Sequence, residues 1–297
     1  MTSQGEDPRL PNFLIVGAMK AGTTSLYHYL RPHPQLFMAS IKELDFFVEE
    51  LNWSRGIEWY RRQFARAGRY PARGEASTNY SKYPRFKGVP ERIAKLVPQA
   101  RLIYVVRDPI ERMRSHYQHS FALGVERAPI SDALINNPAY LMSSRYGLQV
   151  EQYRDHFPPD QVLIVTSEEL RDQRAHTMVR VYRFLGIDVG YIAPTLDREY
   201  YKTKERTQYS PLIASLRNTL KKRVPYSKRA KELVDSLGQR PKRFTSHRRE
   251  RRDHSSPAPA PNTIPDTTRT RLEEILAEDV ARLRAYMPPG FDGWGIG

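Results

Sequence analysis

The chain has 297 residues, 39% of them hydrophobic and none of them cysteine, which suffices for one large domain and excludes disulfides and thiol catalysis. Its 48 lysines and arginines against 33 acidic residues give a formal net charge of +15, so nucleic acid and small anions are both candidate partners. No apolar run approaches the length of a membrane span and the first residues lack an apolar signal region, so we expect a cytoplasmic protein without a membrane span.

The first predicted element is a strand that leads into a phosphate-binding turn. An apolar run ends at Gly17 and helical spacing begins at Thr23, which predicts a strand over 13–17 and a helix over 23–31. The exposed N–H groups at a helix start, together with the helix dipole, bind anionic phosphate. The segment therefore predicts a site for a phosphorylated nucleotide.

The position of the lysine distinguishes this loop from that of the P-loop NTPases. A Walker A loop reads G-x-x-x-x-G-K-[ST], but in GAMKAGTT (17–24) Lys20 precedes the second glycine, Gly22. The segment resembles the 5′-phosphosulfate loop, commonly G-x-x-K-[AGS]-G-T-T, of sulfotransferases that use 3′-phosphoadenosine 5′-phosphosulfate (PAPS). This resemblance implies that consecutive loop and helix residues bind the donor, namely Lys20, Ala21, Gly22, Thr23, Thr24 and Ser25.

Residues 32–90 are predicted to form loops on the acceptor side of the site. Within them, KELDFF (42–47) resembles the family's K-E-x-x-[FY]-F segment, and GEASTNY (74–80) resembles its G-E-x-[ST]-x-x-Y segment. Heparan-sulfate-type members usually carry a lysine directly after the glutamate of the second segment. Here that position is Ala76, so we expect the role of that lysine to be lost or moved, with Lys82 as the candidate.

A second strand and helix follow, with polar residues at the corner between them. The β-branched run over 102–106 is typical of a buried parallel strand, and Asp108 is a suitable N-cap for a helix over 109–122. An arginine at the end of a strand and a serine on the next helix can together bind a phosphate. By the resemblance, Arg107 and Ser115 bind the 3′-phosphate of PAPS.

The remaining sequence continues the alternation of strands and helices. A strand is predicted over 162–166, with helices near 131–136, 144–157, 174–185 and 268–286. The stretch 198–232 is basic, and the stretch 240–266 is basic and then Pro/Ala-rich, so we expect the second to be a mobile loop. The resemblance implies that Lys204 and Arg206 lie over the adenosine and 3′-phosphate, and an exposed run of charge is the alternative interpretation.

Strands that alternate with helices predict an α/β fold with a P-loop-like central parallel sheet and helices on both faces. Ligands bind such sheets at the carboxyl ends of the strands. Both proposed phosphate sites directly follow strands, so we expect them to share one crevice. We interpret 1–297 as a single sulfotransferase domain, similar to the heparan-sulfate-type and related bacterial sulfotransferases.

The resemblance implies in-line transfer of the sulfuryl group of PAPS to a hydroxyl of a carbohydrate or other small-molecule acceptor. Lys20 is expected to stabilise the leaving oxygen. Glu43 is the first candidate for the general base, and its alternative is a surface carboxylate that pairs with Lys42 or Arg55. His119 shares a helical face with Ser115 and is the second candidate base. We expect no metal and no nucleic-acid partner, and the sequence leaves the acceptor and the oligomeric state open.

Two other functions compete with this interpretation. A P-loop nucleotide kinase or NTPase would need a lysine directly after Gly22 and a carboxylate for Mg²⁺, yet the residue that follows the 102–106 strand is Arg107. A nucleic-acid-binding protein driven by charge would show strong, salt-dependent DNA binding and no binding of adenosine 3′,5′-bisphosphate (PAP).

Overall fold

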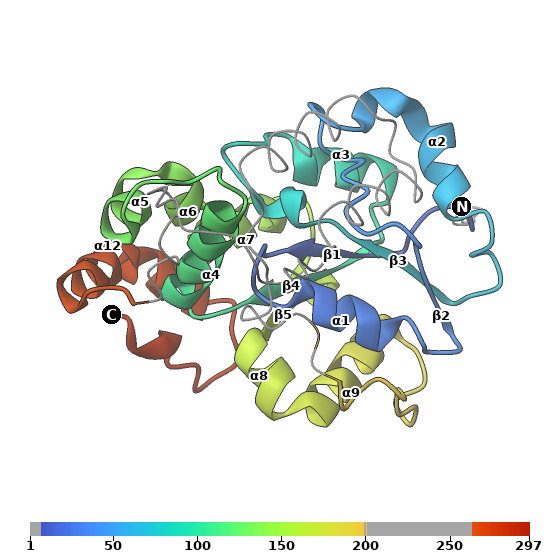
Figure 1. The fold of residues 1–297 in the computed structure, drawn as a ribbon. Coiled ribbons are helices and arrows are strands. Elements are labelled where there is room, and N and C mark those ends of the chain that lie inside the picture. The colour runs from blue at the N-terminus through green and yellow to red at the C-terminus, as the bar shows by residue number, and fades with distance from the viewer. Residues whose placement is uncertain (1–6, 199, 201–262) are drawn as a thin grey trace, which may run out of the picture.

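The computed structural model describes residues 7–198, 200 and 263–297, and a five-stranded sheet lies at its centre (Figure 1). The strands are β1 (Phe13–Gly17), β2 (Leu36–Met38), β3 (Ala72–Ala76), β4 (Arg101–Val106) and β5 (Val162–Thr166). Their order is β2-β3-β1-β4-β5, and every neighbouring pair is parallel. The predicted α/β fold with a central parallel sheet is therefore confirmed.

Helices cover both faces of this sheet (Figure 1). On one side lie α1 (Thr23–Leu30), α8 (Ser167–Asp172) and α9 (Arg174–Leu185). On the other side lie α2 (Gly56–Gln63) and α3 (Val89–Leu96). Leu26 of the first layer and Ile93 of the second belong to the same hydrophobic cluster as the strands, so one core runs through the sheet.

A second hydrophobic cluster lies beside the sheet and contains no strand residue. It is formed by α4 (Pro109–Ala122), α5 (Ile130–Asn136), α6 (Pro138–Met142) and α12 (Asp266–Arg284). Ile110, Met113 and Tyr117 of α4 are buried in it, as their spacing in the sequence predicts. Next to this cluster, Asp279 of α12 accepts hydrogen bonds of 3.0 and 2.9 Å from the first turn of α7 (Tyr146–Arg154), which ties α12 to the sheet core.

Two sequence predictions of local structure are wrong. Residues 32–90 are not only loops, because they contain β2, β3, α2 and the 3₁₀ helices Trp53–Arg55 and Thr78–Ser81. Strand β3 reads ARGEA and is buried along its whole length, so its charged residues conceal the apolar signal of a strand. The helix predicted near 144–157 is present but its predicted extent is too long, because α7 begins at Tyr146 after a turn at residues 143–145 and ends at Arg154.

Candidate active site

The loop after β1 is held closely against its neighbours. Ala18 N donates a 2.7 Å hydrogen bond to the carbonyl of Val105 in the adjacent strand. At Gly17, an added Cβ would lie 1.8 Å from Ser81 Oγ, so only glycine fits between β1 and the second 3₁₀ helix. Lys20 has a φ of 72°, in the left-handed region that non-glycine residues seldom adopt. The loop is thus shaped by close packing and strained backbone rather than by side-chain capping.

The helix that follows begins with backbone N–H groups that have no acceptor within the helix. Leu26 N donates the first intrahelical hydrogen bond, of 3.1 Å, to Gly22 O, so the N–H groups of Thr23, Thr24 and Ser25 have no intrahelical acceptor. The first turn carries no acidic residue. The hydroxyl of Ser25 donates to the carbonyl of Tyr200 at 3.3 Å. This helix start therefore offers three N–H donors and a positive dipole end to an anion.

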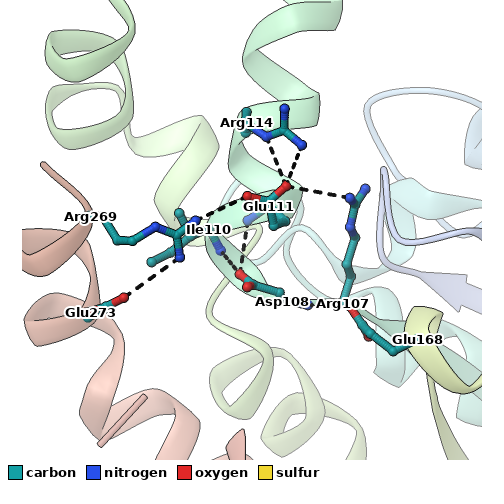
Figure 2. A network of polar contacts seen from close by, with 8 residues as sticks. All are labelled: Arg107, Asp108, Ile110, Glu111, Arg114, Glu168, Arg269 and Glu273. Carbon is teal, nitrogen blue, oxygen red and sulfur yellow. Dashed lines mark hydrogen bonds and ion pairs between the residues drawn. The ribbon is translucent and has the colours of Figure 1, made fainter. Parts of the chain in front are cut away.

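The second predicted corner lies beside the first, because β4 pairs with β1. Asp108 caps α4 as expected, accepting hydrogen bonds of 2.8 and 3.0 Å from Ile110 N and Glu111 N. Its own N–H donates to Glu168 Oε1 of α8 at 3.2 Å, which fixes the corner to the next strand–helix connection (Figure 2). The two corners therefore open at the same edge of the sheet, as the sequence predicts.

Arg107 lies in a network in which three arginines converge on Glu111 (Figure 2). Glu111 is 2.5 Å from Arg114 and 3.2 Å from Arg269 of α12, but 3.9 Å from Arg107. Because Glu111 is engaged by two closer guanidinium groups, it neutralises Arg107 only in part. Glu111 and Ser115 lie one turn apart on α4, and Ser115 is buried. The guanidinium of Arg107 thus lies beside Glu111, one helical turn before Ser115.

Glu43 is held in one orientation on the other side of the loop. Its N–H donates to Ala76 O at 2.8 Å, and its Oε2 accepts hydrogen bonds from Thr78 N and Thr78 Oγ1 at 2.7 and 3.1 Å. Its Oε1 forms an ion pair with Lys42, which is the alternative that the sequence left open. The residue has a φ of 64°, so strained backbone presents this carboxylate, as it does Lys20.

Asp45 is a site residue that the sequence analysis missed. Its φ is 49°, its Oδ2 accepts a 3.0 Å hydrogen bond from Asn79, and its buried Oδ1 has no partner among the described residues. Burial, together with the nearby Glu43 and Glu75 carboxylates, raises the pKa of Asp45 to about 7. Positive φ and burial leave no pattern in the sequence. The one available signal for Asp45 was its position two residues after Glu43.

A buried network of hydrogen bonds holds the backbone of Asp45. Asp45 N donates to Ser77 Oγ at 2.9 Å, and Ser77 in turn donates to Glu75 at 2.6 Å. The fully buried Glu75 also accepts from the hydroxyls of Tyr60 and Tyr80 at 2.9 and 2.6 Å. These satisfied partners fix the segment that carries Glu43 and Asp45.

Lys82 approaches the loop from the second 3₁₀ helix. Its ammonium nitrogen lies 3.4 Å from the sulfur of Met19, the residue before Lys20. Burial lowers the pKa of Lys82 to about 8, although Glu43 and Asp45 act in the opposite direction. Lys82 therefore lies between the donor loop and the two carboxylates. That Lys82 takes over the role of the lysine missing at position 76 stays a prediction.

Helix α4 contributes a buried cation beneath the same loop. Arg112 is fully buried and donates to Ser144 Oγ and Tyr140 O, both at 2.6 Å, and to Met19 O at 3.5 Å. The sequence analysis missed it, because Arg112 lies on the polar side of α4, opposite Ile110 and Tyr117, and only the fold buries it there. Its partners are neutral oxygens, so its positive charge adds to the field at the loop.

The two histidines of α4 differ in their environment. His116 Nδ1 lies 3.5 Å from Arg112 Nη1, and burial, Arg112 and Lys82 lower the pKa of His116 to about 2. His116 is therefore neutral at any ordinary pH. His119 and Lys20 also lower this pKa, so both lie near His116. His119, the second candidate base, thus belongs to the same neighbourhood as the donor loop.

Two predicted residues, Lys204 and Arg206, lie outside the described residues, as does most of the predicted loop 240–266. In the part of the chain that the structure describes, no group of histidine and carboxylate side chains is arranged to hold a metal ion. No helix within that part has both the length and the apolar character needed to cross a membrane.

The sulfotransferase domain family matches residues 10–232, three quarters of the chain, and the chain therefore belongs to this family of enzymes. The fold agrees: a sulfotransferase from Alicyclobacillus acidocaldarius superimposes with a TM-score of 0.67 at 23% identity, over 96% of this chain and 98% of that one.

Among curated relatives, the chain is similar to heparan sulfate N-deacetylase/N-sulfotransferases. It is 32% identical to human bifunctional heparan sulfate N-deacetylase/N-sulfotransferase 3 over 60% of this chain. It is 28% identical to enzyme 1 of this group from Xenopus laevis over 66% of this chain. The matches span only 22% and 23% of the length of these relatives.

Proposed function

We propose that this sulfotransferase moves the sulfuryl group of PAPS to a hydroxyl of a carbohydrate or other small-molecule acceptor by in-line displacement. The observation that carries the proposal is the pair of adjacent β–α corners. One carries Lys20 and three N–H groups without an intrahelical acceptor, and the other presents Arg107 and Ser115. A nucleotide with phosphates at both its 5′ and 3′ positions matches such a pair of anion sites.

In this proposal the chain binds each end of the donor with different chemistry. The N–H groups of Thr23, Thr24 and Ser25 hold the 5′-phosphate at the positive end of α1. Arg107 forms charge-assisted hydrogen bonds with the 3′-phosphate, since its pair with Glu111 is loose. The donor itself supplies the activated sulfur–oxygen bond.

The catalytic groups then act on either side of the sulfur. The Lys20 ammonium stabilises the negative charge that develops on the leaving phosphate oxygen. Glu43 accepts the acceptor's proton as the new bond to sulfur forms, and Thr78 keeps its carboxylate aimed for this step. His119 is the second candidate for this base, from the α4 side of the site.

The acceptor class rests on the relatives. Two similar proteins are named as acting on heparan sulfate, a carbohydrate. We therefore propose a carbohydrate acceptor first. Labelled PAPS, offered with desulfated glycosaminoglycans, simple sugars and amino sugars in parallel, tests it by the position of the label in the product. Label that enters none of the sugars contradicts the acceptor class and leaves the donor untouched.

The donor is tested by calorimetric titration of PAP in the presence of EDTA. We expect binding without metal, and weaker binding of adenosine 5′-monophosphate, which lacks the 3′-phosphate. Lys20→Ala should retain its circular dichroism spectrum and lose sulfuryl transfer. No PAP binding by the wild-type protein, or undiminished transfer by Lys20→Ala, would overturn the proposed function.

A further inference from the structure

Lys82 is an ammonium group without a strong acceptor in a crowded polar environment. Among the described residues its Nζ donates one hydrogen bond, to the thioether sulfur of Met19. A thioether is a weak acceptor, and an ammonium carries three donors. Two donors of a partly buried cation are therefore left for another partner.

Three of the four carboxylate oxygens of Glu43 and Asp45 are engaged by other donors, and the fourth, Oδ1 of Asp45, has no partner among the described residues. Glu43 pairs with Lys42 and accepts two hydrogen bonds from Thr78, while Oδ2 of Asp45 accepts from Asn79. A lysine that only supported the fold would be expected to form one of these pairs itself. Instead, Lys82 points past them to the residue before Lys20.

The charges around Lys82 define where this ammonium lies in the site. Glu43 and Asp45 face it from the loop after β2, Arg85 from its own segment, and Arg112 from α4. His116 of α4, which is neutral, also feels its charge. Lys82 thus lies between the candidate base and the donor loop, where the group in transfer has to pass.

We propose that Lys82 is a second catalytic ammonium, which donates hydrogen bonds to the non-bridging oxygens of the sulfuryl group during its transfer; this inference rests on the proposed function. The acceptor oxygen bonds to sulfur while the bond from sulfur to the bridging phosphate oxygen breaks. That phosphate oxygen keeps the electron pair next to Lys20, and Glu43 takes the acceptor's proton. Lys82 keeps its own proton throughout.

The proposal has a consequence for proton binding. In the free protein the pKa of Lys82 is about 8, because burial and the Arg85 and Arg112 charges oppose its protonation. A polyanion bound to the loop stabilises the charged ammonium, so its pKa rises. Near pH 8, the binding of PAP should therefore draw a fraction of a proton from the buffer.

The first experiment compares Lys82→Met with Lys82→Arg and with Lys95→Met, an exposed lysine of α3 that serves as control. Transfer to water, measured as PAP released from PAPS, needs no knowledge of the acceptor. Lys82→Met should slow this release about 100-fold at saturating PAPS. Lys95→Met should leave it unchanged.

The second experiment does not depend on turnover. Calorimetric titration of PAP near pH 8, in two buffers with different ionisation enthalpies, gives the number of protons taken up. Uptake should be seen with the wild type and with Lys95→Met. It should be clearly smaller in Lys82→Arg, whose guanidinium is always charged, and any uptake by Asp45, whose pKa is about 7, is common to all three proteins.

Each outcome decides between definite alternatives. PAP release by Lys82→Met within a few-fold of wild type, or proton uptake by Lys82→Arg as large as that of wild type, overturns the role of Lys82 and leaves the proposed function standing. Failure of the wild type to bind PAP overturns both. If Lys82→Met does not fold, proton uptake by Lys82→Arg still decides the question.

Discussion

At the scale of single residues, the candidate site is built on backbone that most side chains avoid. Lys20, Glu43 and Asp45 all have positive φ, and among the described non-glycine residues only Trp294 shares this feature. The left-handed conformation costs roughly 1–2 kcal/mol per residue. Three such residues around one loop indicate that side-chain placement at this site is maintained at the expense of stability.

Asp45 also lowers the stability of the fold through its buried carboxyl, and this effect depends on pH. Its pKa is about 7 in the folded protein against an ordinary value of 3.8 for aspartate, so the folded state binds this proton more tightly than the unfolded chain. Stability is therefore lost as pH rises from about 4 to about 7. We predict that Asp45→Asn is more stable than wild type at pH 8, by at most about 4 kcal/mol. The two proteins should converge at low pH.

Urea unfolding of both proteins at pH 4 and pH 8 measures this difference. Asp172→Asn, a change at an exposed aspartate, is the matched control and should show no comparable gain. An identical pH dependence for Asp45→Asn and wild type would mean that Asp45 is ionised at little cost in the folded protein.

A comparison of Glu43 and His119 variants identifies the general base. We predict that Glu43→Gln lowers kcat for sulfuryl transfer by about 10²–10⁴-fold, because the amide cannot accept the proton. PAP affinity should change little, since Gln still accepts the hydrogen bonds of Thr78. His119→Ala is measured beside it by the same transfer assay. Activity that survives in Glu43→Gln and disappears in His119→Ala would assign the base to His119.

At the scale of elements, we expect the β4–α4 corner to bind the 3′-phosphate. Arg107→Ala should weaken PAP binding by about 10–100-fold, the worth of a hydrogen bond between charged groups. Adenosine 5′-phosphosulfate, which has no 3′-phosphate, should bind both proteins alike. Calorimetry on the two ligands makes the measurement, with Arg271→Ala on the outside of α12 as control. Equal weakening of both ligands would argue against a 3′-phosphate contact.

Elements whose local sequence agrees with their surroundings were predictable. Strand β1, strand β5 and helix α4 lie where apolar runs and the Asp108 cap placed them. Strand β3 was not, because Arg73 and Glu75 are buried by partners remote in sequence, such as Leu10 O and the Tyr60 hydroxyl. Propensity describes neighbours along the chain, and these two residues are stabilised by neighbours in space.

The same distinction applies to the site. Lys20 and Arg107 follow strands directly, so the sequence alone placed them at the right edge of the sheet. Asp45 and Arg112 were missed, because their importance arises from burial among groups that only the fold assembles. Lys82 was noticed only as a candidate substitute for the lysine missing at position 76, and its approach to Met19 requires the turn of the second 3₁₀ helix.

At the scale of the whole molecule, the candidate nucleotide site joins two hydrophobic cores. Strand β4 belongs to the sheet core and α4 to the helical cluster, so the corner at Arg107 lies on the boundary between them. The two cores also meet where α12 packs against α7. At that contact the backbones of the two helices are so close that a Cβ on Gly147 would lie 2.6 Å from the carbonyl oxygen of Asp279.

This arrangement predicts that two ways of changing stability are independent. Gly147→Ala should lower the free energy of unfolding by about 1–3 kcal/mol, because the backbone of α12 cannot move aside without repacking. PAP at about 100 times its dissociation constant should raise it by about 2.7 kcal/mol, in wild type and variant alike. Urea unfolding with and without PAP, in EDTA, gives both quantities. A variant that folds but gains less than wild type from PAP would show that α12 helps to form the nucleotide site, through Arg269 and the network around Glu111 that orients Arg107.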